Sequence, residues 1–208
     1  MRWAVLLLSC MLATTAVAAP TRRATRRAEL TREFQAGVDA FRLGKLDVAR
    51  QRLEKARALD PSLAGPHRFL AAVARAQGRY EECVAAARRA LVANPRSREL
   101  AATRALHEDC RTAGGRAPYK GELADSAAIA VECNVGGAIV TIGGLVYGAT
   151  PLAPRVLMPG TFSIVVAKPG WKPAHVVIDV IPGVVTDVAI ELVAQQSDPS
   201  VPRPHPRR

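Results

Sequence analysis

The sequence predicts a two-part protein in which an all-α half is followed by an all-β half. Between residues 34 and 95, small residues, glycines and prolines recur with a period of 34 residues, which is a period of paired helices. Between residues 131 and 194, apolar residues alternate along the chain and closely spaced glycines and prolines interrupt them, which is typical of a small β-sandwich. A chain of 208 residues accommodates two such domains.

Residues 1–18 have the three parts of a secretory signal peptide. Arg2 supplies the charge, an apolar run extends from Trp3 to Leu12, and Ala16-Val17-Ala18 forms an Ala-x-Ala cleavage site. The run is shorter than the roughly 20 apolar residues of a membrane-spanning helix, which disfavours a membrane anchor. Cys10 leaves lipidation as an alternative. We therefore expect export to the periplasm or to the outer surface of a bacterial envelope, with a mature chain that starts near Ala19.

Residues 29–113 are expected to form a helical domain, preceded by a basic segment at 19–28. The repeat pairs Gly44 with Gly78 and Pro61 with Pro95, and such residues end helices. A capping helix should cover the last apolar face, with Ser97 as its N-cap. The predicted helices cover Glu29–Leu43, Leu46–Leu59, Pro66–Gln77, Tyr80–Ala93 and Ser97–Thr112.

This region resembles two tetratricopeptide repeats, through the pairs Gly44/Gly78, Ala49/Cys83, Ala56/Ala90 and Pro61/Pro95. It departs from the family at Glu33 and Ala36, where an aromatic residue and a leucine are usual. The resemblance implies a concave face that binds a peptide or another protein. By repeat position this face would present Phe34, Val38, Phe41, Arg42, Arg68 and Arg75. The alternative is that the repeats only pack against the β-domain.

Residues 114–126 are predicted to be a polar linker because they contain several glycines and a proline among few apolar residues. In the β-domain at 127–194, Phe162, Ile164 and Val166 predict one strand, and Val176, Ile178 and Val180 predict another. Type II turns are predicted at Pro159-Gly160, Pro169-Gly170 and Pro182-Gly183, since proline presets the second position and glycine tolerates positive φ at the third. The proline-rich, basic tail at 195–208 is predicted to be disordered.

The β-domain resembles a PEGA domain, a β-sandwich module of envelope and surface proteins of bacteria and archaea. The matching residues are Gly137-Ala138, Val140, Ile142, Gly144, Gly148, Thr150-Pro151-Leu152, Leu157, Pro159-Gly160 and Gly170-Trp171. The sequence departs from the family at Val135-Gly136, where Pro-Glu is usual, and at Cys133, where a serine is usual. The family has no known catalytic residues, so the resemblance implies a structural or binding module.

The formal net charge of +11 belongs to the helical half and the tail. Residues 129–194 hold three basic residues against four acids. Nucleic acid is the usual partner of such a chain, but an exported protein rarely meets it, so acidic envelope polymers or membrane headgroups fit better. The alternative is that the arginines only cover the solvent-exposed faces of helices.

No enzyme, cofactor or metal motif is found in the sequence. Nucleophile elbows, phosphate-binding loops that end in lysine and paired carboxylates in apolar surroundings do not occur. His107 and Cys110 lie one helical turn apart and supply half of a metal site, but no second pair stands at ligand spacing. We therefore expect no enzyme activity, cofactor or metal.

Three cysteines remain after the predicted cleavage, in a compartment that permits disulfides. Cys83 and Cys110 lie equally far from the turn near residues 96 and 97, so an antiparallel helix pair brings them abreast and a disulfide is predicted. The alternative for Cys83 is a buried, unpaired thiol. Cys133 is predicted to stay reduced and buried.

Two functional hypotheses follow from these observations. The first is a non-enzymatic envelope binding or scaffold protein, whose helices engage a protein partner and whose β-domain associates with an envelope surface. The second is a protein that binds acidic envelope polysaccharide through its basic helical face and tail. High salt weakens the second kind of interaction but not one made by apolar helix faces.

Overall fold

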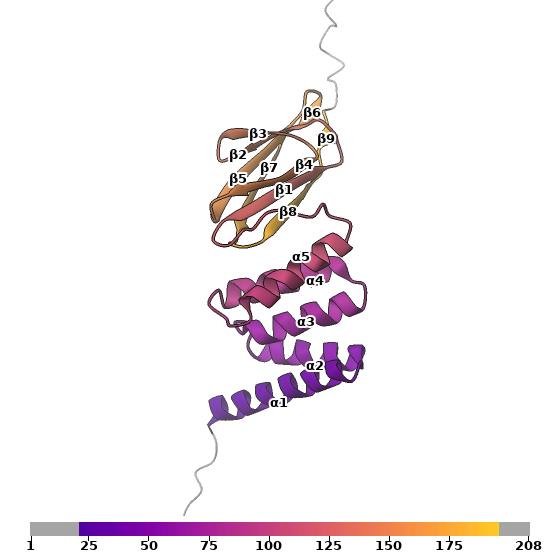
Figure 1. The fold of residues 1–208 in the computed structure, drawn as a ribbon, viewed down its shortest axis with the longest axis vertical. Helices are drawn as coiled ribbons and strands as arrows, with labels where there is room; N and C mark the ends of the chain where they lie inside the picture. The colour runs from indigo at the N-terminus through magenta and orange to yellow at the C-terminus, as the bar shows by residue number, and fades with distance from the viewer. Residues whose placement is uncertain (1–20, 196–208) are drawn as a thin grey trace, which may run out of the picture.

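The structure of the chain, a computed structural model, describes residues 21–195. Five helices come first, α1 (Arg22–Arg42), α2 (Leu46–Leu59), α3 (Ala64–Ala76), α4 (Tyr80–Ala93) and α5 (Leu100–Ala113). Figure 1 shows the helices stacked below a β-domain, with α1 farthest from it. The predicted order of an all-α half and an all-β half is confirmed. The predicted signal peptide, and the predicted tail beyond Gln195, lie outside the described residues.

Each helix packs against the next one in the chain, and α3 also contacts α1 and α5. Small side chains dominate the shared core, among them Ala49, Ala71 and Ala87, all fully buried. Alanines let the helices approach closely. The approach is closest at Gly37 of α1, where an added Cβ would lie 2.7 Å from Cγ of Leu53 on α2.

Three helix starts differ from the prediction, and the smallest difference is at α3, which begins at Ala64 and not at Pro66. Helix α1 begins at Arg22, so most of the predicted basic segment at 19–28 is helical. Thr21 caps it, because its Oγ1 accepts a hydrogen bond from the backbone N–H of Ala24 at 3.3 Å. Helix α5 begins at Leu100, and Ser97 is not its N-cap. Instead, Ser97 Oγ accepts from the N–H of Glu99 at 3.1 Å within the preceding turn.

The β-domain is a sandwich of two facing sheets with a small third sheet. The first sheet has the strand order β4-β1-β8, the second β3-β2-β5-β7, and the third β6-β9. Strands β1 and β8 are parallel, and the other paired strands are antiparallel. The bounds are β1 Ala127–Cys133, β2 Ile139–Ile142, β3 Leu145–Ala149, β4 Leu152–Leu157, β5 Gly160–Ala167, β6 Trp171–Lys172, β7 Ala174–Val180, β8 Val185–Ile190 and β9 Val193–Ala194.

The sandwich core contains the residues that alternation along the chain predicted. Ile164 and Val166 of β5 are fully buried, and Phe162, Val176 and Ile178 pack against them at the margin. Gly170 and Gly183 adopt positive φ of 82° and 79°, as type II turns require. The prediction was wrong at Pro159-Gly160, because Gly160 is already the first residue of β5 and pairs with Val180.

A buried arginine joins the two halves. The side chain of Arg111 on α5 is only 1% exposed, and its Nε donates to Oδ2 of Asp187 on β8 at 2.6 Å. Its Nη1 donates to Glu108 at 3.1 Å, and both Nη1 and Nη2 donate to the carbonyl oxygen of Ala117. Burial raises the pKa of Asp187, and Arg111 opposes this rise. The guanidinium is thus fully hydrogen-bonded at the contact between helix and sheet.

Other contacts extend this domain junction. Arg88 of α4 donates to Thr186 Oγ1 at 3.3 Å and to the carbonyl oxygen of Asp179. Arg116 pairs with Glu81 of α4 and with Glu132 of β1, and the hydrogen bond to Glu132 holds the pKa of Arg116 above its usual value.

The predicted linker also belongs to the junction. Leu123 is buried with Ala128, Ala130 and Val185, and Tyr119 packs against them. The outer face of β1 is therefore covered, and residues 114–126 are not a purely polar spacer. Ion pairs and this apolar cluster together bridge the two halves.

Candidate functional site

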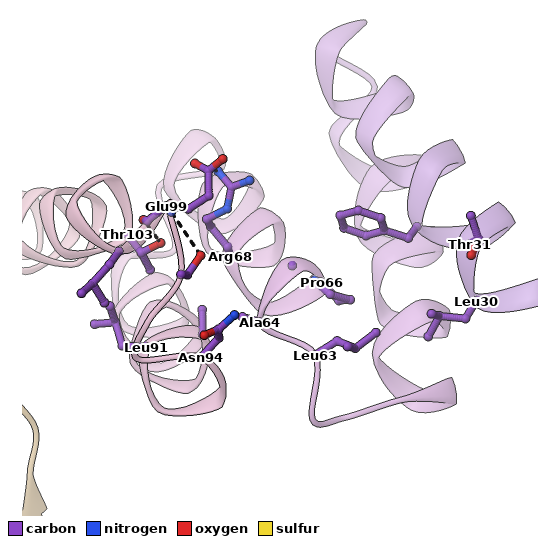
Figure 2. A pocket seen from close by; sticks show the side chains of 15 residues that line it. Leu30, Thr31, Leu63, Ala64, Pro66, Arg68, Leu91, Asn94, Glu99 and Thr103 are labelled. Carbon is purple, nitrogen blue, oxygen red and sulfur yellow. Dashed lines mark hydrogen bonds and ion pairs between the residues drawn. The ribbon is translucent and has the colours of Figure 1, made fainter. Parts of the chain in front are cut away.

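Helices α1, α3, α4 and α5 surround a cavity of about 340 Å³. We call it the inner cavity. Leu30 and Phe34 come from α1, Leu63 and Pro66 from the start of α3, and Leu91, Leu100 and Thr103 from α4 and α5. Figure 2 shows Leu30 and Thr31 on one side, Leu91 and Thr103 on the other, and Leu63 and Pro66 between them. The lining is mostly apolar, and apolar clefts with few polar groups are typical of binding sites.

An aromatic cluster lies beside the cavity. Phe34 and Phe41 of α1 both meet Phe69 of α3 edge to face, with ring centroids 5.7 and 6.0 Å apart. Such pairs contribute beyond the area they bury. The structure therefore brings the two predicted site residues Phe34 and Phe41 together through Phe69, which the repeat positions did not single out. The sequence feature that could have identified Phe69 is its position next to Arg68, at the start of the apolar stretch of residues 69–74.

The predicted site arginines lie on the same helices but have carboxylate partners. Arg68 pairs with Glu99 at 3.3 Å, and its guanidinium lies 4.7 Å from the centroid of the Phe69 ring. Arg75 donates to Asp109 of α5 at 2.6 Å, a hydrogen bond that holds the pKa of Arg75 above its usual value. These partners come from the capping helix and the turn before it, so the inner face is less basic than the first-helix residues alone predict.

Two further residues of the predicted face take other positions. Arg42, at the end of α1, is exposed, and its one ion pair within residues 21–195 is with Asp39 of the same helix at 3.6 Å. Val38 is buried in the helical core and is not available to a partner. The cavity thus includes Phe34 and Arg68 from the predicted set, while Phe41, Arg42 and Arg75 do not line it.

Glu33 places a carboxylate at a core position of the first repeat, and an arginine compensates its charge. The side chain is nearly buried and accepts from Arg52 of α2 at 3.0 Å. This hydrogen bond lowers the pKa of Glu33, so the carboxylate is charged at neutral pH. Arg32 lies close enough to add a second ion pair at 3.5 Å.

A disulfide joins Cys83 of α4 to Cys110 of α5, with a Cα separation of 6.0 Å. Both cysteines are fully buried in the helical core. The pairing agrees with the prediction that the two residues lie abreast in an antiparallel helix pair. Cys133, by contrast, is half-buried and unpaired within residues 21–195, so its predicted full burial was wrong.

Metal and membrane features were also sought in the described residues. In residues 21–195 no group of three or more His, Cys, Asp and Glu side chains lies close enough to hold a metal ion. His107 and Cys110 lie one helical turn apart, but Cys110 is bonded to Cys83 and therefore supplies no thiolate ligand for a metal ion. Over the same range, no helix combines the length and the apolar character needed to cross a bilayer.

Comparison with known proteins concerns only the second half of the chain. No curated protein was found to match the chain. Residues 126–196 match the family model of the PEGA domain, as the sequence predicts, and the five helices lie outside this match.

Proposed function

We propose that this chain is a non-enzymatic binding or scaffold protein of the cell envelope. Its helical half engages a segment of a protein partner, and its PEGA domain associates with an envelope or surface structure. The inner cavity carries this proposal, since about 340 Å³ of mostly apolar space opens between the helices α1, α3, α4 and α5. Tetratricopeptide arrays, which this half resembles, bind partners on the corresponding face.

The lining suggests what kind of segment would bind. Leu30, Phe34, Leu63 and Leu100 offer apolar contacts for a side chain of leucine or phenylalanine size. Thr31 and Asn94 supply the polar groups that would fix the orientation of the backbone. Arg68 is neutralised by Glu99, so the partner needs no acidic residue at this point. The expected interaction is therefore apolar and resists salt.

Export is part of the same proposal. The disulfide between Cys83 and Cys110 supports an oxidising compartment, since disulfides form in the periplasm and outside the cell and are rare in the cytosol. The match of residues 126–196 to the PEGA domain supports a surface role. We place the protein in the periplasm or on the outer surface, with its mature chain starting near Ala19.

A capture experiment from envelope extract tests the main proposal. The tagged chain from residue 19 is compared with a Leu30→Gln/Leu63→Gln variant at low and high salt. The matched control is Leu43→Gln/Val48→Gln, which changes two exposed apolar residues outside the cavity. We expect a partner that survives high salt, is lost with the cavity variant and is kept with the control. Equal capture by all three proteins would reject the cavity as the binding site.

A second function has support of its own, the binding of acidic envelope polysaccharide. The first turns of α1 carry four exposed arginines, Arg22, Arg23, Arg26 and Arg27. None of them forms an ion pair within residues 21–195, although Arg26 donates to the carbonyl oxygen of Leu59 at 2.6 Å. Exposed, uncompensated arginines attract polyanions, and this attraction weakens with salt.

A further inference from the structure

A second, more open groove lies on the other side of the helical half, between α2 and α4. Its volume is about 980 Å³. Arg57 and Ala58 come from α2, and Pro61 and Ser62 from the loop that follows. Helix α4 adds Ala85, Arg88, Arg89, Val92 and Ala93, and His67 of α3 completes the lining. We call it the outer groove. Among residues 21–195, three arginines and no acidic residue line it.

The absence of acids is unusual for this molecule. Most arginines of α2 to α5 and the segment after α5 pair with a carboxylate, namely Arg50, Arg52, Arg68, Arg75, Arg79, Arg111 and Arg116. Arg50 and Arg79 lie on the same α2–α4 side as the outer groove and share Glu82. In residues 21–195, however, no carboxylate forms an ion pair with Arg57, Arg88 or Arg89.

Two of these three guanidinium groups are partly withdrawn from solvent. Arg57 and Arg88 are half-buried, and Arg89 is exposed. Arg88 donates only to neutral acceptors, the Thr186 hydroxyl and the carbonyl oxygen of Asp179. Burial lowers the pKa of Arg88, because the charged form loses hydration, and the charge of Asp179 opposes this only in part. An anion in the outer groove would supply a counter-ion.

His67 adds a group of different chemistry to the same groove. Its side chain is nearly buried, and Nε2 lies 2.9 Å from the carbonyl oxygen of Pro61. Because a carbonyl oxygen only accepts, Nε2 carries the proton, and in the neutral ring Nδ1 is an acceptor. Nδ1 is buried and has no hydrogen-bond partner in the described part of the chain. An unused buried acceptor is the complement of a hydroxyl donor.

We infer that the outer groove binds an acidic polysaccharide of the uronate type. The carboxylates of such a polymer pair with Arg57, Arg88 and Arg89, which suit bidentate recognition. A hydroxyl group of the polymer reaches the buried Nδ1 acceptor of His67 once the imidazole ring turns toward the groove. The apolar faces of its sugar rings pack against Pro61 and Val92, the latter 60% exposed. This inference rests on the second function proposed above and adds a groove on α2 and α4 to the α1 arginines that support that function.

A polysaccharide fits this groove better than a bilayer surface does. Cations that bind lipid headgroups stand on a protruding surface, whereas Arg57 and Arg88 are half-buried in the groove walls. A single extended chain can enter such a groove, and a vesicle surface cannot.

The test compares binding of polygalacturonate by the chain from residue 19 and by two variants. The groove variant is Arg57→Gln/Arg89→Gln, which leaves Arg88 at the domain junction intact. The matched control is Arg96→Gln/Arg98→Gln, which removes the same charge from exposed, unpaired arginines outside the groove. Circular dichroism spectra establish that both variants fold. Affinities are measured by calorimetry at low salt, with vesicles of phosphatidylglycerol and a single-stranded oligonucleotide as the other probes.

We expect the groove variant to bind polygalacturonate about 10- to 100-fold more weakly and the control to stay within about threefold of the wild type, since a charge-assisted hydrogen bond changes affinity by about tenfold. Equal weakening in both variants would overturn the groove as the site while leaving polysaccharide binding intact. No binding by the wild type would overturn the second proposed function together with the inference. Binding of vesicles or of the oligonucleotide, lost in the groove variant, with no binding of polygalacturonate, would overturn the ligand class.

Discussion

Replacing Arg111 by methionine should separate the two halves of the protein. The substitution keeps an unbranched apolar stem but removes the guanidinium that donates to Asp187, to Glu108 and to the carbonyl oxygen of Ala117. The side chain of Asp187 is only 15% exposed, so its carboxylate would be left partly buried without a cation. Removing one partner of a buried ion pair costs about 3–5 kcal/mol. That is a large part of a typical stability of about 5–15 kcal/mol.

The assay uses two signals that report on the two halves. Trp171 is the only tryptophan after Trp3, so the fluorescence of the chain from residue 19 reports on the β-domain. The far-ultraviolet circular dichroism reports mainly on the five helices. In urea at pH 7 we expect the two signals of the wild type to change together, because the buried junction couples the halves. In the Arg111→Met variant the two transitions should separate, and at least one should shift to lower urea.

Two matched variants decide whether the ion pair is the cause. Arg111→Met/Asp187→Leu should recover much of the loss, since replacing a buried pair by apolar residues is often neutral. Arg75→Gln breaks an ion pair with Asp109 in which both side chains are over a third exposed, so its stability should stay close to that of the wild type. A cost below about 1 kcal/mol for Arg111→Met would refute the argument. So would a wild type whose two signals already change at different urea concentrations.

Three further predictions concern the helical half. Burial, and to a smaller extent the charges of neighbouring arginines, lowers the pKa of His107 from 6.5 to about 4. The unfolded state therefore binds a proton at a higher pH than the folded state does, and roughly 3 kcal/mol of stability is lost as pH falls from 6.5 to 4. Unfolding of the wild type and a His107→Gln variant across this range should show a difference in slope, and parallel curves would contradict the assignment. Removing the disulfide by Cys83→Ala/Cys110→Ala should lower the free energy of unfolding by about 2–4 kcal/mol, because the unfolded chain is no longer restricted by a crosslink between residues 27 positions apart. An unchanged urea midpoint would speak against this. Gly37→Ala should destabilise by about 1–3 kcal/mol despite the better helix propensity of alanine, because the new Cβ would lie 2.7 Å from Leu53; a more stable variant would show that the helices can move apart.

The sequence was sufficient for features that depend on local patterns. Helices α2 and α4 begin and end at the residues that the 34-residue repeat predicted, because glycine and proline fix those ends. The core of the sandwich followed from alternation, since successive strand residues point to opposite faces. The disulfide followed from the equal distances of Cys83 and Cys110 from one turn.

The domain junction could not be predicted in the same way. Arg111 and Asp187 are 76 residues apart, and nothing in either segment alone shows that they meet. One signal was present, the apolar run from Ala127 to Val131, which is buried at every residue. A strand in a two-sheet sandwich that faced solvent on its outer side would alternate, so an unbroken apolar run indicates that a second surface covers it.

The inner cavity was also predicted only in part from the sequence. Phe34 and Arg68 were placed on one face by their positions in the repeat, and both line the cavity. The neutralisation of Arg75 was missed because its partner Asp109 lies 34 residues later, one repeat period further along, in a helix interpreted only as a cap. The capping helix therefore contributes charge as well as apolar cover.

The contacts that hold the molecule together are concentrated on α4 and α5. The disulfide between Cys83 and Cys110 fixes these two helices to each other. Arg88 of α4 and Arg111 of α5 then attach the pair to β8 and the strand before it. Arg88 also lines the outer groove, so one side chain belongs to the domain junction and to the proposed polysaccharide site. The same helix pair also contributes Leu91 and Leu100 to the lining of the inner cavity. Both candidate surfaces are thus built on the part of the helical half that is most firmly joined to the β-domain.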